Sequence, residues 1–226
     1  MFEIVLHYSY LLPIICFLFL GKKQMKINTL LIVAYSIVFF LLLIFIDELN
    51  SWINQHTGFK GFYLSFYTFL EYIFFTSFIY INISSKTLKK AFIYLSVGFV
   101  IFQVIYYLNF TIKNLDSVPI GVETILLFGY VIFFFYEQFR KPSNISIYNH
   151  YCFWICVGIL IYLGGSFFFY IMAGQMPKTE IKEHWYLTYI GEIIKNIFFS
   201  FSILLFARQK NGNGIHNKIL PNLDMV

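Results

Sequence analysis

Long apolar runs dominate this chain and restrict it to a membrane fold. Seven runs of about 17 to 25 residues occur, the length that a helix needs to cross roughly 30 Å of hydrocarbon at 1.5 Å per residue. They cover residues 4–20, 27–46, 62–82, 91–109, 118–136, 151–173 and 185–207. Only 12% of the 226 residues are charged, against about a quarter in a soluble domain. The chain is therefore predicted to be an integral membrane protein.

Each run is predicted to be an α-helix. Stretches such as VIFFFY and LLLIFI lack the alternation of apolar and polar residues that a membrane barrel strand requires. The predicted fold is all-α: a polytopic bundle of seven transmembrane helices within residues 1–208. Residues 209–226 are polar and contain Asn-Gly-Asn-Gly, so we expect a short, disordered cytoplasmic tail that is too small for an output domain.

The distribution of basic residues between the loops predicts the orientation. Eleven Lys and Arg residues fall in alternate loops and the tail: Lys22, Lys23, Lys26, Lys86, Lys89, Lys90, Arg140, Lys141, Arg208, Lys210 and Lys218. The opposite loops carry only four, Lys60, Lys113, Lys178 and Lys182. Because cytoplasmic loops are enriched in Lys and Arg, the N-terminus is predicted to lie outside and the C-terminus in the cytoplasm.

Polar side chains inside the predicted spans are the main indication of function. An ionisable group costs roughly 2.5 to 3.5 kcal/mol at a helix centre, so its retention needs a reason. The ionisable and amide groups lie about 7 to 15 Å from the outer ends of four helices, which suggests a shared depth. The predicted polar network or ligand-binding site consists of Glu71, Gln103, Glu123, Tyr130, Ser166, Glu192, Lys195 and Asn196.

The last run, WYLTYIGEIIKNIFFSFSILLFA, carries a polar stripe. Its members follow the spacing of three or four residues that places side chains on one helix face: Trp185, Thr188, Glu192, Lys195, Asn196, Phe199 and Ser202. Lipid cannot solvate such a stripe, so it is predicted to face the bundle interior or a water-filled cavity. Glu192 and Lys195 are placed to pair directly. In the preceding run, Gly164 and Gly165 permit close helix packing or leave room for a ligand.

Two interpretations of these buried groups remain open. In the first, Lys195 neutralises one or two carboxylates and fixes the helices in register. In the second, the groups form a ligand pocket or a proton-linked site that faces outward. Three interior carboxylates, Glu71, Glu123 and Glu192, accompany a single lysine, so at least one carboxylate is expected to keep its proton.

The sequence predicts no catalytic residue, no metal site and no cofactor. It contains no HExxH, GxSxG or P-loop motif, and no His pair with a carboxylate at ligand spacing. A lysine in the seventh helix suits a retinal Schiff base. However, Glu192 precedes it by three residues, where microbial rhodopsins have four, and the arginine of their third helix is missing. No basic stripe with interleaved aromatic residues indicates nucleic-acid binding.

Four stretches resemble a group of uncharacterised seven-helix integral membrane proteins of Bacteroidota: FYTFLEYIFFTSFIY, GVETILLFGYVIFFFYE, FWICVGILIYLGGSFFFYIMA and the closing W…IIKNIFFSFSILLFAR. The resemblance covers roughly residues 62–208. It implies that Glu71, Glu123, Trp154, Gly165, Trp185, Lys195 and Asn196 are family positions. Cys156 and Glu192 depart from the pattern of the group. Similar regions precede some histidine kinases, which implies a sensory role in a bacterial inner membrane.

We therefore expect a signalling membrane protein that binds a small or lipid-derived ligand in an outward-facing polar pocket. Its partners would be membrane lipids, a small molecule, and a signalling protein or a second copy of the chain. The alternatives are a proton- or ion-coupled transporter, a lipid-active enzyme, and an accessory membrane protein of a defence or assembly system.

Overall fold

The computed structural model describes residues 2–19, 26–57, 62–109, 117–140, 147–173 and 176–216, and every regular element in these ranges is a helix. The prediction of an all-α chain is confirmed for this part. The elements are α1 (Phe2–Phe19), α2 (Ile27–Thr57), α3 (Phe62–Asn82), α4 (Lys86–Asn109), α5 (Ser117–Arg140), the 3₁₀ turn η2 (Ile147–Asn149), α6 (Tyr151–Ala173), α7 (Lys178–His184) and α8 (Tyr186–His216).

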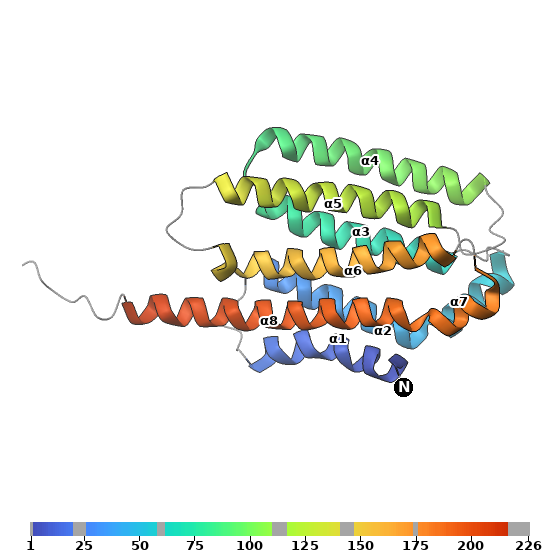
Figure 1. Ribbon diagram of the computed structural model, residues 1–226, viewed down its shortest axis with the longest axis horizontal. Coiled ribbons are helices and arrows are strands. Elements are labelled where there is room, and N and C mark those ends of the chain that lie inside the picture. The colour runs from blue at the N-terminus through green and yellow to red at the C-terminus, as the bar shows by residue number, and fades with distance from the viewer. Residues whose placement is uncertain are drawn as a thin grey trace, which may run out of the picture.

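The seven long helices lie side by side, and consecutive long helices run in opposite directions (Figure 1). Helix α8 packs most extensively against α6 and α1, and α1 also packs on α2. Helix α4 lies at the edge of the bundle, where it contacts α3 and α5. The hydrophobic core draws buried side chains from all seven of these helices, including Phe99 of α4 and Phe134 of α5.

The outer surface of the bundle is apolar. Within the described part of the chain, five stretches are long and apolar enough to cross a membrane: Ile27–Phe45, Lys86–Leu108, Val118–Arg140, Tyr151–Ala173 and Thr179–Arg208. Helix α1 is apolar but shorter, and α3 has the length, 21 residues, but is not among these five stretches. Helix α4 exposes Leu95, Ile101, Val104, Ile105 and Leu108. A continuous apolar face of this kind is unfavourable in water and suits contact with lipid.

Helix α4 begins five residues before the predicted position, and its N-terminus is capped from another helix. The Glu137 carboxylate of α5 accepts hydrogen bonds from the backbone N–H of Ser84 (2.8 Å) and of Ser85 (3.1 Å). The hydroxyl of Ser85 accepts a bond from the Leu88 N–H at 3.4 Å. These acceptors satisfy N–H groups that a helix start leaves free, and the negative charge complements the helix dipole.

Two other boundaries differ from the predicted ones. Helix α2 continues past residue 46, where the predicted span ends, to Thr57. Helix α8 is preceded by the short α7, and it continues to His216, within the range predicted to be disordered. Residues 217–226 lie outside the described residues. Trp185 separates α7 from α8, and its ring packs edge-on against Phe169 of α6 at 5.6 Å between ring centroids.

Helices α6 and α8 approach each other closely at Gly158. A Cβ atom built on Gly158 would lie 2.9 Å from Cβ of Phe198 in α8, closer than two carbon atoms can approach without a shift. Gly164 and Gly165, the pair predicted to permit close helix packing, do not form such a contact. A Cβ at Gly164 would meet only the tip of Phe128, at 3.6 Å, and one at Gly165 would meet nothing within 4 Å.

Gly158→Ala is expected to lower the free energy of unfolding by about 1–3 kcal/mol, because the added methyl forces α6 away from α8. Gly129→Ala is the matched control. It lies within α5, and nothing lies within 4 Å of its added Cβ, so its effect should be neutral or slightly stabilising. Thermal unfolding of the detergent-solubilised protein measures both. Equal stability of the two variants would contradict the close α6–α8 contact.

Candidate functional site

Lys195 of α8 is the centre of the buried polar groups. Its side chain is 0% exposed, although an ammonium loses several kcal/mol of hydration on entering such an interior. The ammonium donates a hydrogen bond to the hydroxyl of Tyr35 at 2.5 Å. It also lies 3.9 Å from Oε1 of Glu71. The prediction that the polar stripe of this helix faces the bundle interior is confirmed, since Glu192, Asn196 and Ser202 are also buried.

Both carboxylate oxygens of Glu71 accept a hydrogen bond from a tyrosine. The Tyr35 hydroxyl donates to Oε1 at 3.1 Å, and the Tyr162 hydroxyl donates to Oε2 at 3.0 Å. An ionised carboxylate only accepts hydrogen bonds, so two donors together with a nearby ammonium form the environment of a charged Glu71. The Tyr35 hydroxyl accepts a hydrogen bond from Lys195 and donates one to Glu71, so it bridges the two charged groups.

Glu192 has the same arrangement but different donors. Tyr10 donates to its Oε2 at 2.6 Å, and Tyr67 donates to its Oε1 at 3.1 Å. The Tyr67 hydroxyl also lies 3.4 Å from that of Tyr162. Within the described part of the chain, the ion pair of Lys195 is with Glu71. The expected direct pair between Glu192 and Lys195 is therefore not formed, because the two tyrosines hold both oxygens of Glu192.

Aromatic rings surround the ammonium of Lys195. Its Nζ lies 3.8 Å from the ring centroid of Tyr162, 4.8 Å from Tyr35, 5.6 Å from Tyr10 and 5.8 Å from Phe75. The negative faces of such rings attract a cation, and the attraction is stronger when water is excluded. We define the Lys195 network as Lys195 and the two glutamates and four tyrosines bonded to it or to one another: Glu71, Glu192, Tyr10, Tyr35, Tyr67 and Tyr162.

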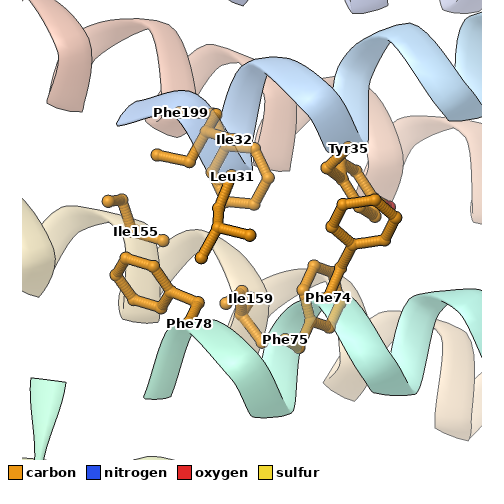
Figure 2. Close-up of a pocket in the computed structure, with 9 residues that line it drawn as sticks. All are labelled: Leu31, Ile32, Tyr35, Phe74, Phe75, Phe78, Ile155, Ile159 and Phe199. Carbon is orange, nitrogen blue, oxygen red and sulfur yellow. The ribbon is translucent and has the colours of Figure 1, made fainter. Parts of the chain in front are cut away.

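The network joins five helices that are distant in the sequence. Its residues come from α1, α2, α3, α6 and α8. Next to it lies a small apolar cavity of about 10 Å³, measured as the space open to the centre of a water molecule. In Figure 2, side chains of α2, α3, α6 and α8 converge on this cavity, and Tyr35 lies at one end of it. Its lining offers almost no polar group, so this cavity is expected to be dry.

A second cavity, of about 20 Å³ by the same measure, has a polar lining. It lies between α3, α5 and α6, and we call it the carboxylate cavity. Glu71 and Glu123 line it, together with the hydroxyl residues Thr68, Thr124 and Ser166. Tyr67 and Tyr162 of the Lys195 network line it as well. Of the predicted site residues, Glu71, Glu123, Ser166, Glu192 and Lys195 are thus gathered in the network and the adjoining cavity.

Three predicted residues lie elsewhere. Gln103 donates to the backbone oxygen of Ser65 at 2.9 Å and so joins α4 to α3. Tyr130 lies 3.1 Å from the Tyr72 hydroxyl and stacks on Phe92, with ring centroids 3.9 Å apart. Asn196 neighbours Lys195 in sequence, but its amide donates to Ser9 of α1 at 2.8 Å.

A further polar cluster lies near the starts of α2 and α6 and was not predicted. The Asn28 amide donates to Oδ1 of Asn82 at 2.8 Å and to the hydroxyl of Tyr151 at 2.9 Å. The thiol of Cys152 also donates to Oδ1 of Asn82, at 3.3 Å. Asn28 and Asn82 lie at the ends of their apolar runs, where polar residues are expected because a loop adjoins them. Nothing in the sequence therefore indicates this cluster.

Among the described residues, no group of three or more His, Cys, Asp and Glu side chains could hold a metal ion. A bundle of long apolar helices, an apolar outer face and a buried charged network are typical of a multi-pass membrane protein. No protein-family model matches the chain, and comparisons with curated proteins and with solved structures give no match.

Lys195→Met is expected to destabilise the protein by about 3–5 kcal/mol, because it leaves the buried Glu71 carboxylate without its cation. Adding Glu71→Gln should recover part of this loss, since the double variant removes both members of the ion pair. Chemical unfolding in detergent micelles measures the four combinations. Lys86→Met, an exposed lysine of α4, should change stability little. Simple additivity of Lys195→Met and Glu71→Gln would contradict their coupling.

Proposed function

We propose that this chain is a sensory protein of the bacterial inner membrane. It spans the bilayer seven times, with its N-terminus outside and its C-terminus in the cytoplasm. A small ligand reaches the carboxylate cavity from the outer side and changes the charge that Glu71 and the Lys195 network experience. Helix α8 carries this change to a separate signalling partner, either a protein or a second copy of the chain.

The arrangement of the helix ends supports this orientation. Because consecutive long helices alternate in direction (Figure 1), one end of the bundle gathers the start of α2, α4 and α6 and the end of α3, α5 and α8. Six of the described basic residues belong to this end: Lys26, Lys86, Lys89, Lys90, Arg140 and Arg208. Helix α7, at the other end, carries two lysines, Lys178 and Lys182, together with Glu180 and Glu183. Basic residues favour the cytoplasmic side.

Reporter fusions test the seven spans and their direction. Green fluorescent protein fused after His216 should fluoresce, and alkaline phosphatase fused there should be inactive, because that end is cytoplasmic. Both results should reverse for fusions in the loop between α2 and α3, which lies outside. The same pattern at both positions would contradict the proposed topology.

The observation that carries the sensory proposal is the sharing of residues between the cavity and the network. Tyr67, Glu71 and Tyr162 line the carboxylate cavity and also hold the Lys195 network together. A charge that enters the cavity is therefore in contact with the residues that fix α8 to α2, α3 and α6. A ligand that interacts more favourably with one arrangement of α8 than with another would shift α8 toward that arrangement.

Transport is the second candidate, because a carboxylate-lined cavity also suits proton- or ion-coupled movement. Transporters commonly place such sites at broken helices, whereas α3, α5 and α6 are continuous across the cavity. Flux measurements in proteoliposomes separate the two functions. Ion or proton flux that Glu123→Gln abolishes would favour transport over sensing.

Removing the charge of Glu123 should move α8 if the cavity and the network are coupled. Leu204 of α8 and Tyr94 of α4 are exposed and serve as cysteine positions for spin labels, with Cys16 replaced by serine. Glu123→Gln should shift the distance between the labels by about 1–2 Å or more, the scale of helix shifts in switching proteins. Double electron–electron resonance spectroscopy in nanodiscs measures the distance between the two spin labels.

The control for this measurement is Glu180→Gln, which removes an exposed carboxylate from α7. It should leave the distance distribution unchanged. If Glu123→Gln also leaves it unchanged while the protein stays folded, the buried groups form a structural network only, and the sensory proposal fails.

A further inference from the structure

The carboxylate cavity contains buried oxygen atoms that lack a hydrogen-bond partner. Oε1 of Glu123 and Oγ1 of Thr124 have none among the described residues. Glu123 is 2% exposed and Thr124 is 1% exposed. Leaving a buried polar group unsatisfied costs about 1–3 kcal/mol, and more when the group is charged. Both residues line the cavity, so a guest within it would lie beside the side chains that carry these oxygens.

The charge around the cavity is also unbalanced. Glu71 and Glu192 each accept two tyrosine hydrogen bonds, as ionised carboxylates do, and Lys195 supplies the single positive charge of the network. Lys195 therefore offsets one of these two negative charges. Glu123 adds a further carboxylate that has no cationic partner among the described residues. The site attracts positive charge.

The volume of the cavity and the chemistry of its lining restrict the class of ligand that can bind there. A volume of about 20 Å³ holds roughly one water-sized particle. The polar side chains that face it offer only oxygen, from Glu71, Glu123, Thr68, Thr124 and Ser166. Hard cations prefer oxygen ligands, whereas transition metals favour nitrogen and sulfur. Calcium takes six to eight oxygens, usually several of them from carboxylates. Glu192 does not line the cavity, and of the two carboxylates that do, Glu71 is already paired with Lys195, so the site better suits one positive charge than two.

We infer that the carboxylate cavity binds one sodium ion between Glu71 and Glu123. The ion contacts Oε1 of Glu123 and Oγ1 of Thr124 and completes its shell with neighbouring hydroxyls or a water molecule. This inference names the ligand class for the cavity of the proposed function, but the binding itself requires no signalling.

Thermal unfolding of the full chain in nanodiscs tests the inference. Sodium chloride is titrated against choline chloride at constant ionic strength and near-neutral pH. Sodium at about five times its Kd should raise the Tm by about 2–4 °C. Potassium should stabilise less, because the cavity is small. Glu123→Gln and Thr124→Val should each abolish or strongly reduce the sodium-dependent shift.

Glu180→Gln, with its exposed carboxylate, is the matched control and should keep the full shift. Thr124→Val retains the shape of the side chain and all carboxylates, so it decides the question if Glu123→Gln does not fold. Equal unfolding temperatures of the wild type in sodium and choline would overturn the inference. So would stabilisation by acid in choline with no sodium effect, because a proton would then neutralise Glu123. A sodium shift without any movement of α8 would support the ion site and contradict only the sensory proposal.

Discussion

The structure depends on the burial of one ammonium group. Lys195 has no exposed surface, and an isolated charge in such an interior is strongly unfavourable. Its partners come from four other helices: Tyr10 from α1, Tyr35 from α2, Glu71 from α3 and Tyr162 from α6. Separating α3 from α8 would leave the buried ammonium without its carboxylate, and separating α1, α2 or α6 would remove a hydrogen bond or a ring contact from it. The charge therefore specifies the arrangement of helices that apolar packing alone would leave degenerate in lipid.

Tyrosine suits this network for a physical reason. Its ring packs in an apolar interior and faces a cation, while its hydroxyl donates to a carboxylate without adding a charge. Tyr162 performs both roles, since its ring lies 3.8 Å from the Lys195 ammonium and its hydroxyl bonds Glu71. A second lysine or an arginine in the same position would bring a further desolvation penalty. Four tyrosines satisfy two carboxylates at lower cost.

Helix positions could be predicted well because the apolar runs themselves carry the signal. Residues 62–82 and 151–173 coincide with α3 and α6. The start of α4 could not be predicted in this way, because its cap, Glu137, comes from about fifty residues further along the chain. Length and hydropathy determine where a helix can cross the bilayer, but they contain no information on such tertiary contacts.

The site was predicted in part, for a related reason. Helical spacing was enough to identify the buried face of α8, and the cost of interior charge identified Glu71 and Glu123. The depth of a residue in the membrane does not show toward which neighbouring helix its side chain points. Gln103 and Tyr130 were therefore assigned to the same site as residues that they do not contact. Tyr10 and Tyr35 gave no signal among 18 tyrosines, because only the fold brings them to Lys195.

The structural and functional interpretations of the buried carboxylates apply to different residues. Glu71 and Glu192 each have both oxygens occupied by tyrosine hydroxyls, so they are committed to holding the helices together. Oε1 of Glu123 has no hydrogen-bond partner among the residues that the structure describes, and Glu123 lines a cavity. A group already satisfied gains little from a ligand, whereas an unsatisfied one gains the full interaction. Binding at Glu123 therefore leaves the tyrosine hydrogen bonds of Glu71 and Glu192 in place. Glu71 lines the cavity and also pairs with Lys195, so it connects a ligand bound at Glu123 to α8.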